Sequence, residues 1–175
     1  MTERALDSTR VYDGRIIGVK VDTVALQNGG RAVREVVEHR PAVVLVPIDP
    51  DGNIILVRQY RYAVGETLLE APAGIIEESE TPLGCAQREL QEEVGYASMN
   101  LRALGGFWTS PGFSTEFIYA YLVKDLIPSK LKADADENIR IEKFPVSSIS
   151  KLIRLGEIQG AMTITALLMA AYHFD

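Results

Sequence analysis

The stretch that decides the fold is GIIEESETPLGCAQRELQEEVGY, residues 74–96, which combines the signals of a helix with a cluster of acidic side chains. Thr81 is an N-cap type of residue and Pro82 suits a first helical turn, so a helix is predicted to begin there and to end at Gly95. At about 100° per residue, four apolar side chains form one stripe that is expected to pack on the core: Leu83, Ala86, Leu90 and Val94.

Three carboxylates, those of Glu89, Glu92 and Glu93, occupy an arc beside this stripe. Like charges at neighbouring helical positions repel one another, so a positive group is expected among them. A carboxylate cluster without histidine or a cysteine pair suits Mg²⁺ or Mn²⁺, and magnesium usually completes its shell with substrate phosphates. The competing interpretation is a solvated acidic face on which Arg88 and Glu92 form an ordinary i,i+4 ion pair.

The composition narrows the function classes. A chain of 175 residues that is 47% apolar fits one domain, or one domain with a small appendage. A net charge of −6 without any run of Lys or Arg argues against nucleic acid as a partner. No apolar run is long enough for a membrane span and the first residues are polar, so neither a membrane location nor a signal peptide is expected. The single cysteine, Cys85, excludes an internal disulfide and predicts a cytoplasmic protein with an inert thiol.

Residues 1–40 are predicted to form a β-rich arm. Two strand-like segments, 15–26 and 31–39, flank a turn with the sequence Asn-Gly-Gly and form a hairpin. The second strand offers Arg34 and Glu35 to a ligand or a partner chain, although a solvated hairpin face fits the same pattern.

Pro41 marks the start of the main domain, residues 41–175. Residues 42–48 and 53–60 are interpreted as paired strands of a core sheet, and the main-chain carbonyl of Ala73 is a candidate oxygen ligand for a metal. The closing helix is apolar on nearly every side, so it is expected to be deeply buried or packed on a second subunit. No chemical role is expected for either histidine. The remaining predicted segments are strands at 66–74, 101–108, 117–123 and 139–144, and helices at 146–155 and 161–172.

Mixed strands around one central helix, followed by two more helices, predict an α+β fold of the αβα sandwich type. The stretch 74–96 resembles the signature of the Nudix hydrolases without a departure at any fixed position, and that resemblance implies the same αβα sandwich. Within the family the chain is most similar to the ADP-ribose pyrophosphatases, because it combines a β-rich arm with the segments RQYR, EAPAG and SPGFSTE and an acidic loop before a late strand. Pro111, fifteen residues after Tyr96, is typical of that subgroup.

The resemblance also implies roles for individual residues. Arg88 would orient the metal-binding carboxylates, and Glu137 would be the general base, with Glu92 or Glu93 as the alternatives. Arms exchanged between subunits would make the protein a domain-swapped homodimer. The metal would be held by the Ala73 carbonyl, Glu89, Glu92 and Glu93, and the substrate would be bound by Arg61, Glu116 and, from the neighbouring subunit, Arg34 and Glu35.

The resemblance therefore implies a Mg²⁺-dependent hydrolase that cleaves ADP-ribose into AMP and ribose 5-phosphate. Bound metal would lower the pKa of the attacking water and neutralise the phosphate oxygens. Within the same enzyme class, GDP-mannose or another nucleotide sugar is the competing substrate. A Nudix module that binds nucleotide sugars without cleaving them is the competing hypothesis from another class.

Overall fold

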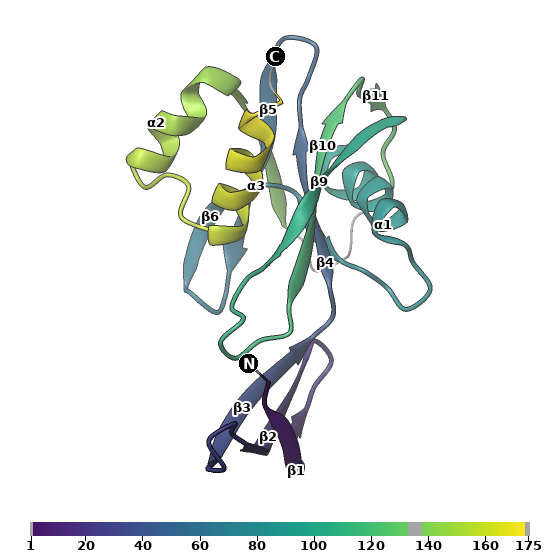
Figure 1. The fold of residues 1–175 in the computed structure, drawn as a ribbon. Helices are drawn as coiled ribbons and strands as arrows, with labels where there is room; N and C mark the ends of the chain where they lie inside the picture. Colours follow the sequence, from purple (N-terminus) through teal and green to yellow (C-terminus); the bar gives the residue numbers. More distant parts are fainter. Residues whose placement is uncertain (1, 133–137, 174–175) are drawn as a thin grey trace. The chain divides into compact units, whose positions relative to one another are not determined.

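The computed structural model describes residues 2–132 and 138–173 (Figure 1). The chain folds into two compact units. The arm unit runs from the N-terminus to Pro41 and takes in the later segment Trp108–Phe117, whereas the core unit comprises Ala42–Phe107 and the chain from Ile118 onward. None of the helices in the described ranges is long and apolar enough to cross a membrane.

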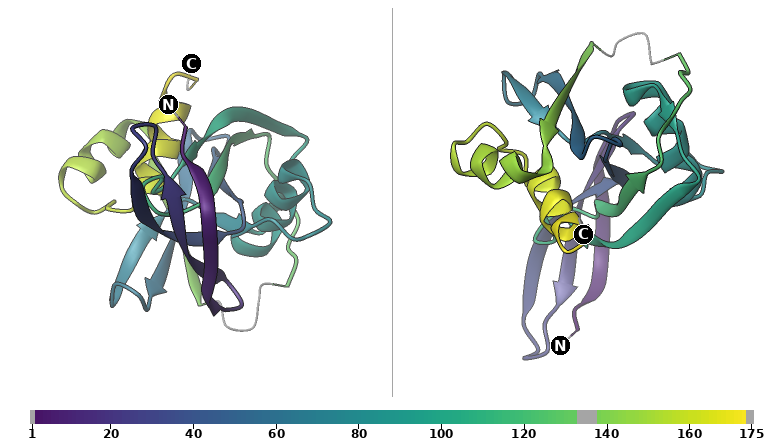
Figure 2. Two further views of the ribbon diagram at one scale, coloured as in Figure 1. Left: turned by 60° about the horizontal axis from the view of Figure 1, so that its bottom comes forward. Right: turned by 90° about the horizontal axis from the view of Figure 1, so that it is seen from above.

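The arm unit contains an antiparallel sheet of three strands, in the order β1 (Arg4–Asp13), β2 (Ile17–Ala25) and β3 (Arg31–His39). Figure 2 shows these strands in purple to dark blue. Strands β2 (Ile17–Ala25) and β3 (Arg31–His39) confirm the predicted hairpin. Strand β1 (Arg4–Asp13) was not predicted, because every one of its residues is exposed and the segment has no alternation of apolar and polar side chains. Two faces open to solvent leave no hydrophobic pattern in the sequence.

The segment Trp108–Phe117 is fastened to strand β3 by backbone hydrogen bonds. The amide of Val37 donates to the Phe113 carbonyl at 2.7 Å, and the amide of Thr115 donates to the Val37 carbonyl at 3.0 Å. The rings of Trp108 and Phe117 meet edge to face with their centroids 4.9 Å apart. These contacts explain why a segment distant in sequence belongs to the arm unit.

The core unit contains two larger sheets and one small one. In the four-stranded sheet, β4 (Ala42–Pro47) and β10 (Phe117–Lys124) run parallel. The three-stranded sheet of the core unit is antiparallel throughout. The four-stranded sheet has the order β7 (Ala73–Ile75), β4 (Ala42–Pro47), β10 (Phe117–Lys124) and β9 (Asn100–Trp108). The three-stranded sheet has the order β12 (Ile139–Pro145), β5 (Asn53–Arg61) and β6 (Glu66–Glu70), and the small sheet pairs β8 (Tyr96–Ala97) with β11 (Ile127–Pro128).

The predicted pairing of segments 42–48 and 53–60 is wrong, because β4 and β5 lie in different sheets and share only the isolated bridge between Ile48 and Ile54. Strand β4 is buried on both faces throughout, and β5 is so buried at Ile54–Val57, so neither apolar run shows the alternation that would identify its neighbour. The chain changes sheets at Asp49, whose buried carboxylate accepts hydrogen bonds from the backbone amides of Asp51 (3.1 Å) and Asn53 (2.9 Å).

Helices cover both faces of the core sheets, which confirms the αβα sandwich (Figures 1 and 2). Successive residues of β4 point into two different hydrophobic clusters. Val44 packs in the cluster that includes residues of α3 (Ala161–Ala171), and Val43 packs in the cluster that includes residues of α1 (Pro82–Glu89). The leucine at 168, on the outer side of α3, is 55% exposed, so the closing helix is buried on one face rather than all round. The helices are α1 (Pro82–Glu89), α2 (Ile149–Arg154) and α3 (Ala161–Ala171).

Candidate active site

Helix α1 and the π turn that follows it, Leu90–Val94, together span the helix that the sequence predicts. The Thr81 hydroxyl accepts a hydrogen bond from the Gly84 amide at 3.1 Å, and the left-handed conformation of Gly95, with φ of 79°, ends the helical segment. Three of the four predicted stripe residues are buried, but Leu83 is 46% exposed. Helical periodicity predicts the direction in which a side chain points. It does not predict how far along the helix the sheet that covers this face extends, which is why the exposure of Leu83 was not foreseen.

The guanidinium group of Arg88 lies at the centre of the carboxylate cluster. It donates to both carboxylate oxygens of Glu80 at 3.0 Å, to Glu89 at 2.6 Å and to Glu92 at 2.9 Å. One guanidinium nitrogen also reaches the carbonyl of Ile75 at 3.3 Å. The positive group that the crowded glutamates require is therefore supplied by the helix itself, and the i,i+4 pair with Glu92 is one contact of a larger network.

The network shifts the pKa values of Glu80 and Arg88. The hydrogen bond from Arg88 holds the pKa of the Glu80 carboxyl below its usual range, in opposition to partial burial, which alone would raise it. In return, hydrogen bonds to Glu80 and Glu92 and the charge of Glu89 raise the pKa of Arg88. Glu80 and Arg88 are thus both charged at neutral pH.

Glu93 lies beyond the last α-helical residue. Helix α1 continues into a π turn, Leu90–Val94, and the Glu93 carboxylate accepts a hydrogen bond from the Ala73 amide at 3.0 Å. The next residue along the chain, Gly74, is the one that approaches the Glu89 carboxylate. Helical periodicity at 100° per residue assumes a regular α-helix and does not predict the π turn.

Gly74 is in direct contact with the Glu89 side chain. A β-carbon at residue 74 would overlap the Glu89 carboxylate, which is only 6% exposed and bound by Arg88. The sequence indicated only a close backbone approach at this glycine. The structure shows that the approaching group is a predicted metal ligand.

The oxygen atoms at this place suit a divalent cation in their chemistry. Glu89, Glu92, Glu93 and the Ala73 carbonyl are all hard donors, the class that Mg²⁺ prefers. The side chains do not converge into a preformed centre, however: within residues 2–132 and 138–173, no three Asp, Glu, His or Cys side chains are grouped to hold a metal ion. The donor set fits the metal, and the assignment of these ligands stays a prediction.

Arg61 lies at the end of β5, where its Nε atom donates to the Glu70 carboxylate at 2.7 Å. Glu70 is buried, whereas Arg61 is partly exposed and available to a ligand. The sequence singled out Arg61 but gave no role to Glu70 or to Glu80. For each of them the sequence offers a carboxylate near an arginine: Glu70 is nine residues from Arg61, and Glu80 is eight residues from Arg88.

The other predicted substrate residues lie in the arm unit. Arg34 forms a two-pronged ion pair with Glu3, at 2.6 and 3.0 Å, and Glu35 lies on the opposite face of β3 because successive strand residues alternate. Glu116 accepts a hydrogen bond from the Thr109 hydroxyl at 2.6 Å and lies 3.6 Å from the ring of His39. Glu137, the predicted base, falls outside the described residues.

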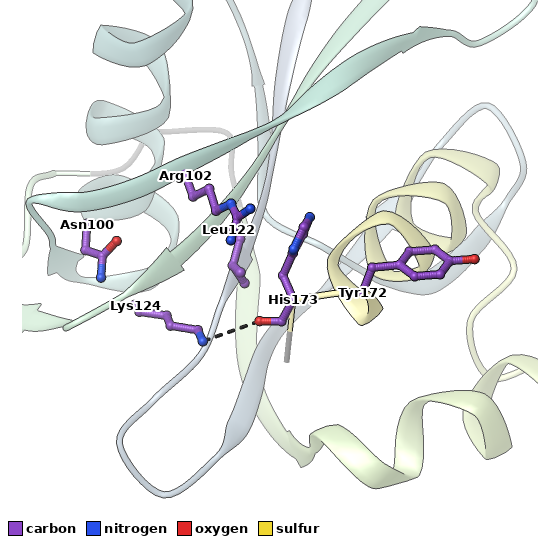
Figure 3. Close-up of a pocket in the computed structure, with 6 residues that line it drawn as sticks. All are labelled: Asn100, Arg102, Leu122, Lys124, Tyr172 and His173. Carbon is purple, nitrogen blue, oxygen red and sulfur yellow. Dashed lines mark hydrogen bonds between the residues drawn. The ribbon is translucent and has the colours of Figure 1, made fainter. Parts of the chain in front are cut away.

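Cavities in the described part of the core unit lie both beside the predicted site and away from it. One, of about 500 Å³, includes Glu92 and Glu93 in its lining, together with Lys130 and Lys143, which the sequence did not single out. The other, of about 360 Å³, is shown in Figure 3, with the Lys124 ammonium donating to the His173 carbonyl at 3.4 Å. No residue of 74–96 lines this second cavity. Its lining comes from Asn100, Arg102, Leu122, Lys124, Tyr172 and His173.

Known proteins resemble the chain over nearly its whole length. Residues 38–163 match the NUDIX domain, and residues 3–37 match the nucleoside diphosphate sugar hydrolase N-terminal domain. An ADP-ribose pyrophosphatase of Bacillus subtilis is 33% identical over 95% of this chain and 91% of its own length. A methanol dehydrogenase activator of Bacillus methanolicus is 34% identical over 94% and 90%. The crystal structure of an ADP compounds hydrolase superposes with a TM-score of 0.90 at 26% identity, covering 98% of this chain and 94% of that one.

Proposed function

The chain belongs to the Nudix family of hydrolases, and from this premise we propose that it cleaves ADP-ribose into AMP and ribose 5-phosphate in the presence of Mg²⁺. The proposal of ADP-ribose is supported by the name of the Bacillus subtilis relative, by the match of the arm to the nucleoside diphosphate sugar hydrolase N-terminal domain, and by Pro111. A cytoplasmic location is part of the same proposal, supported by the single, buried cysteine.

The observation that carries the proposal is the Arg88 network. One guanidinium group holds three carboxylates in place, and the fourth, Glu93, is fixed by a backbone amide. The network thus keeps Glu89 and Glu92 beside one guanidinium group, from which a cation would have to draw them together with Glu93. A module that had lost hydrolysis would have no need to keep every one of these groups.

In this proposal the metal is held by Glu89, Glu92, Glu93 and the Ala73 carbonyl. When bound, it neutralises phosphate charge and lowers the pKa of a coordinated water. Hydrolysis would form a bond from a water oxygen to one phosphorus while the bridging P–O bond breaks, and the water proton would pass to a general base, for which we propose Glu137. Arg88 holds two of the proposed ligands, Glu89 and Glu92, by hydrogen bonds.

Substrate binding is proposed for Arg61 in the core unit and for Arg34, Glu35 and Glu116 in the arm unit. We further propose that the arm, residues 1–40, is exchanged in a homodimer, so that its residues serve the site of the neighbouring subunit. Support comes from β1, which leaves apolar side chains such as Val11 (58% exposed) and Tyr12 (56%) at the surface. A molar mass of one chain by light scattering would reject the dimer.

The direct test of the function is product analysis. The protein is incubated with ADP-ribose with and without Mg²⁺, and the products are separated by chromatography. AMP and ribose 5-phosphate in equal amounts, formed only with metal, are expected. Turnover of GDP-mannose or another nucleotide sugar in preference to ADP-ribose would correct the substrate, and tight binding of ADP-ribose without any turnover would favour the non-catalytic module.

A further inference from the structure

The cavity at the end of the π turn joins acidic and basic side chains. Its volume is about 500 Å³, and Glu92 and Glu93 line it together with Lys130 and Lys143. Ile139 of strand β12 adds an apolar wall. The predicted metal ligands thus share one cavity with two cations, although the chain as a whole has a charge of −6.

The two lysines differ in what balances their charge. The ammonium group of Lys143 lies 3.0 Å from the Asp49 carboxylate, which is buried. That pair holds the turn at which the chain changes sheets, so Lys143 has a structural partner. Among residues 2–132 and 138–173, none forms an ion pair with Lys130. Within these described residues, Lys130 is therefore the cation in this cavity that is available to an anionic ligand.

The backbone on either side of Lys130 is fixed to the π turn. The amide of Ser129 donates to the Gly95 carbonyl at 2.9 Å, and the amide of Leu131 donates to the Gln91 carbonyl at 3.2 Å. The side chain of Gln91 in turn donates to the Ser129 hydroxyl at 2.8 Å. These three bonds place Lys130 at the end of the helix that carries the predicted metal ligands.

The side chain of Lys130 is also directed by packing. Its Cβ, Cγ and Cδ atoms lie 3.9–4.0 Å from the position that a β-carbon of Gly95 would occupy, so the aliphatic stem runs over the glycine. Lys130 itself is exposed to solvent, as expected for a lysine whose stem lies along the backbone.

We propose that this cavity binds the sugar-phosphate half of the substrate and that Lys130 holds its phosphate, an inference that rests on the proposed function. Sugar hydroxyls can donate to the carboxylates of Glu92 and Glu93, and carbon-bound hydrogens of the sugar can pack on Ile139. A phosphorylated sugar thus offers a matching group to each part of the lining: hydroxyl donors to the carboxylates and a phosphate to the lysine.

The test measures equilibrium binding of the two products, ribose 5-phosphate and AMP, by calorimetry in the presence of Mg²⁺. Lys130→Ala is expected to weaken binding of ribose 5-phosphate about tenfold, the effect of losing one charged hydrogen bond, and to leave binding of AMP unchanged. Lys130→Arg should retain most of the affinity. Lys132→Ala is the matched control, because it removes the same charge two residues away from a side chain outside the cavity lining. Thermal denaturation of each variant checks that it folds.

An affinity for ribose 5-phosphate that is unchanged in Lys130→Ala, or undetectable in the unmodified protein, would overturn the inference. A loss of AMP affinity in its place would assign the cavity to the nucleotide half and overturn it equally. Because binding of the products is measured without turnover, the role of Lys130 and the proposed hydrolysis are tested separately. ADP-ribose hydrolysis with no effect of Lys130→Ala refutes only the role of the lysine, whereas Lys130-dependent binding without hydrolysis refutes only the proposed function.

Discussion

Replacement of Arg88 by alanine tests the carboxylate network most severely. The change removes the one guanidinium group that contacts Glu80, Glu89 and Glu92 and leaves their charges crowded together. Breaking a buried ion pair by removing one partner costs about 3–5 kcal/mol. Because the Arg88 side chain is 27% exposed, solvent screening lowers the expectation to about 2–4 kcal/mol. For a chain of this size that corresponds to a melting temperature lower by about 4–16 °C.

Thermal and urea denaturation at neutral pH measure this loss. Arg88→Lys should fall between the two proteins, because lysine keeps the charge but lacks the planar fork that bridges several carboxylates. Arg102→Ala is the control, since Arg102 is exposed and forms no ion pair with any residue in the described part of the chain. Unfolding of Arg88→Ala and Arg102→Ala at the same temperature would refute the reasoning.

The pH dependence of the same difference provides a second check. Arg88 lowers the pKa of Glu80 in the folded state, so this stabilisation is complete above the ordinary carboxyl value of 4.5 and is lost as the pH falls through the lowered one. The stability gap between the unmodified protein and Arg88→Ala should therefore narrow below pH 4.5. A gap that stays constant from neutral pH into this acid range would contradict the electrostatic account.

Four further substitutions test other groups of the site. Glu89→Gln and Glu93→Gln should each remove most ADP-ribose hydrolysis while circular dichroism shows an intact fold, and full activity in both would overturn the metal assignment. Gly74→Ala should displace the Glu89 carboxylate from Arg88 and cost about 1.5–3 kcal/mol by urea denaturation; Gly112→Ala, where a β-carbon meets no atom within 4 Å, serves as its control and should be close to neutral. Glu137→Gln should lower kcat with little change in KM, and an unaffected kcat would reassign the base to Glu92 or Glu93.

The central helix was predictable because several independent local signals agree there. Thr81 as a cap, Pro82 in the first turn and Gly95 at the end each act through the backbone next to them, so no tertiary information was needed. The αβα layers were predictable from a local signal of the same kind. The apolar run at β4 indicates a strand that is buried on both faces, as in a sheet covered by helices on both sides.

Features that depend on long-range pairing were not predictable in this way. Strand β5 pairs with β12 and β6, and its apolar residues Ile54–Val57 do not indicate which strands are its neighbours. The π turn at residues 90–94 leaves no mark in the spacing of the glutamates, which is that of a regular helix. Lys130 lies near the site because the amides of its neighbours Ser129 and Leu131 donate to the carbonyls of Gly95 and Gln91, which are distant along the chain.

The measurement that tests the central claim most directly is anomalous diffraction from crystals soaked in Mn²⁺. We expect a manganese peak about 2.1 Å from carboxylate oxygens of Glu89 and Glu93 and from the main-chain carbonyl of Ala73, the distance typical of small divalent ions of this class. A protein that hydrolyses ADP-ribose in the same buffer while its crystals show no manganese beside these residues would contradict the claim.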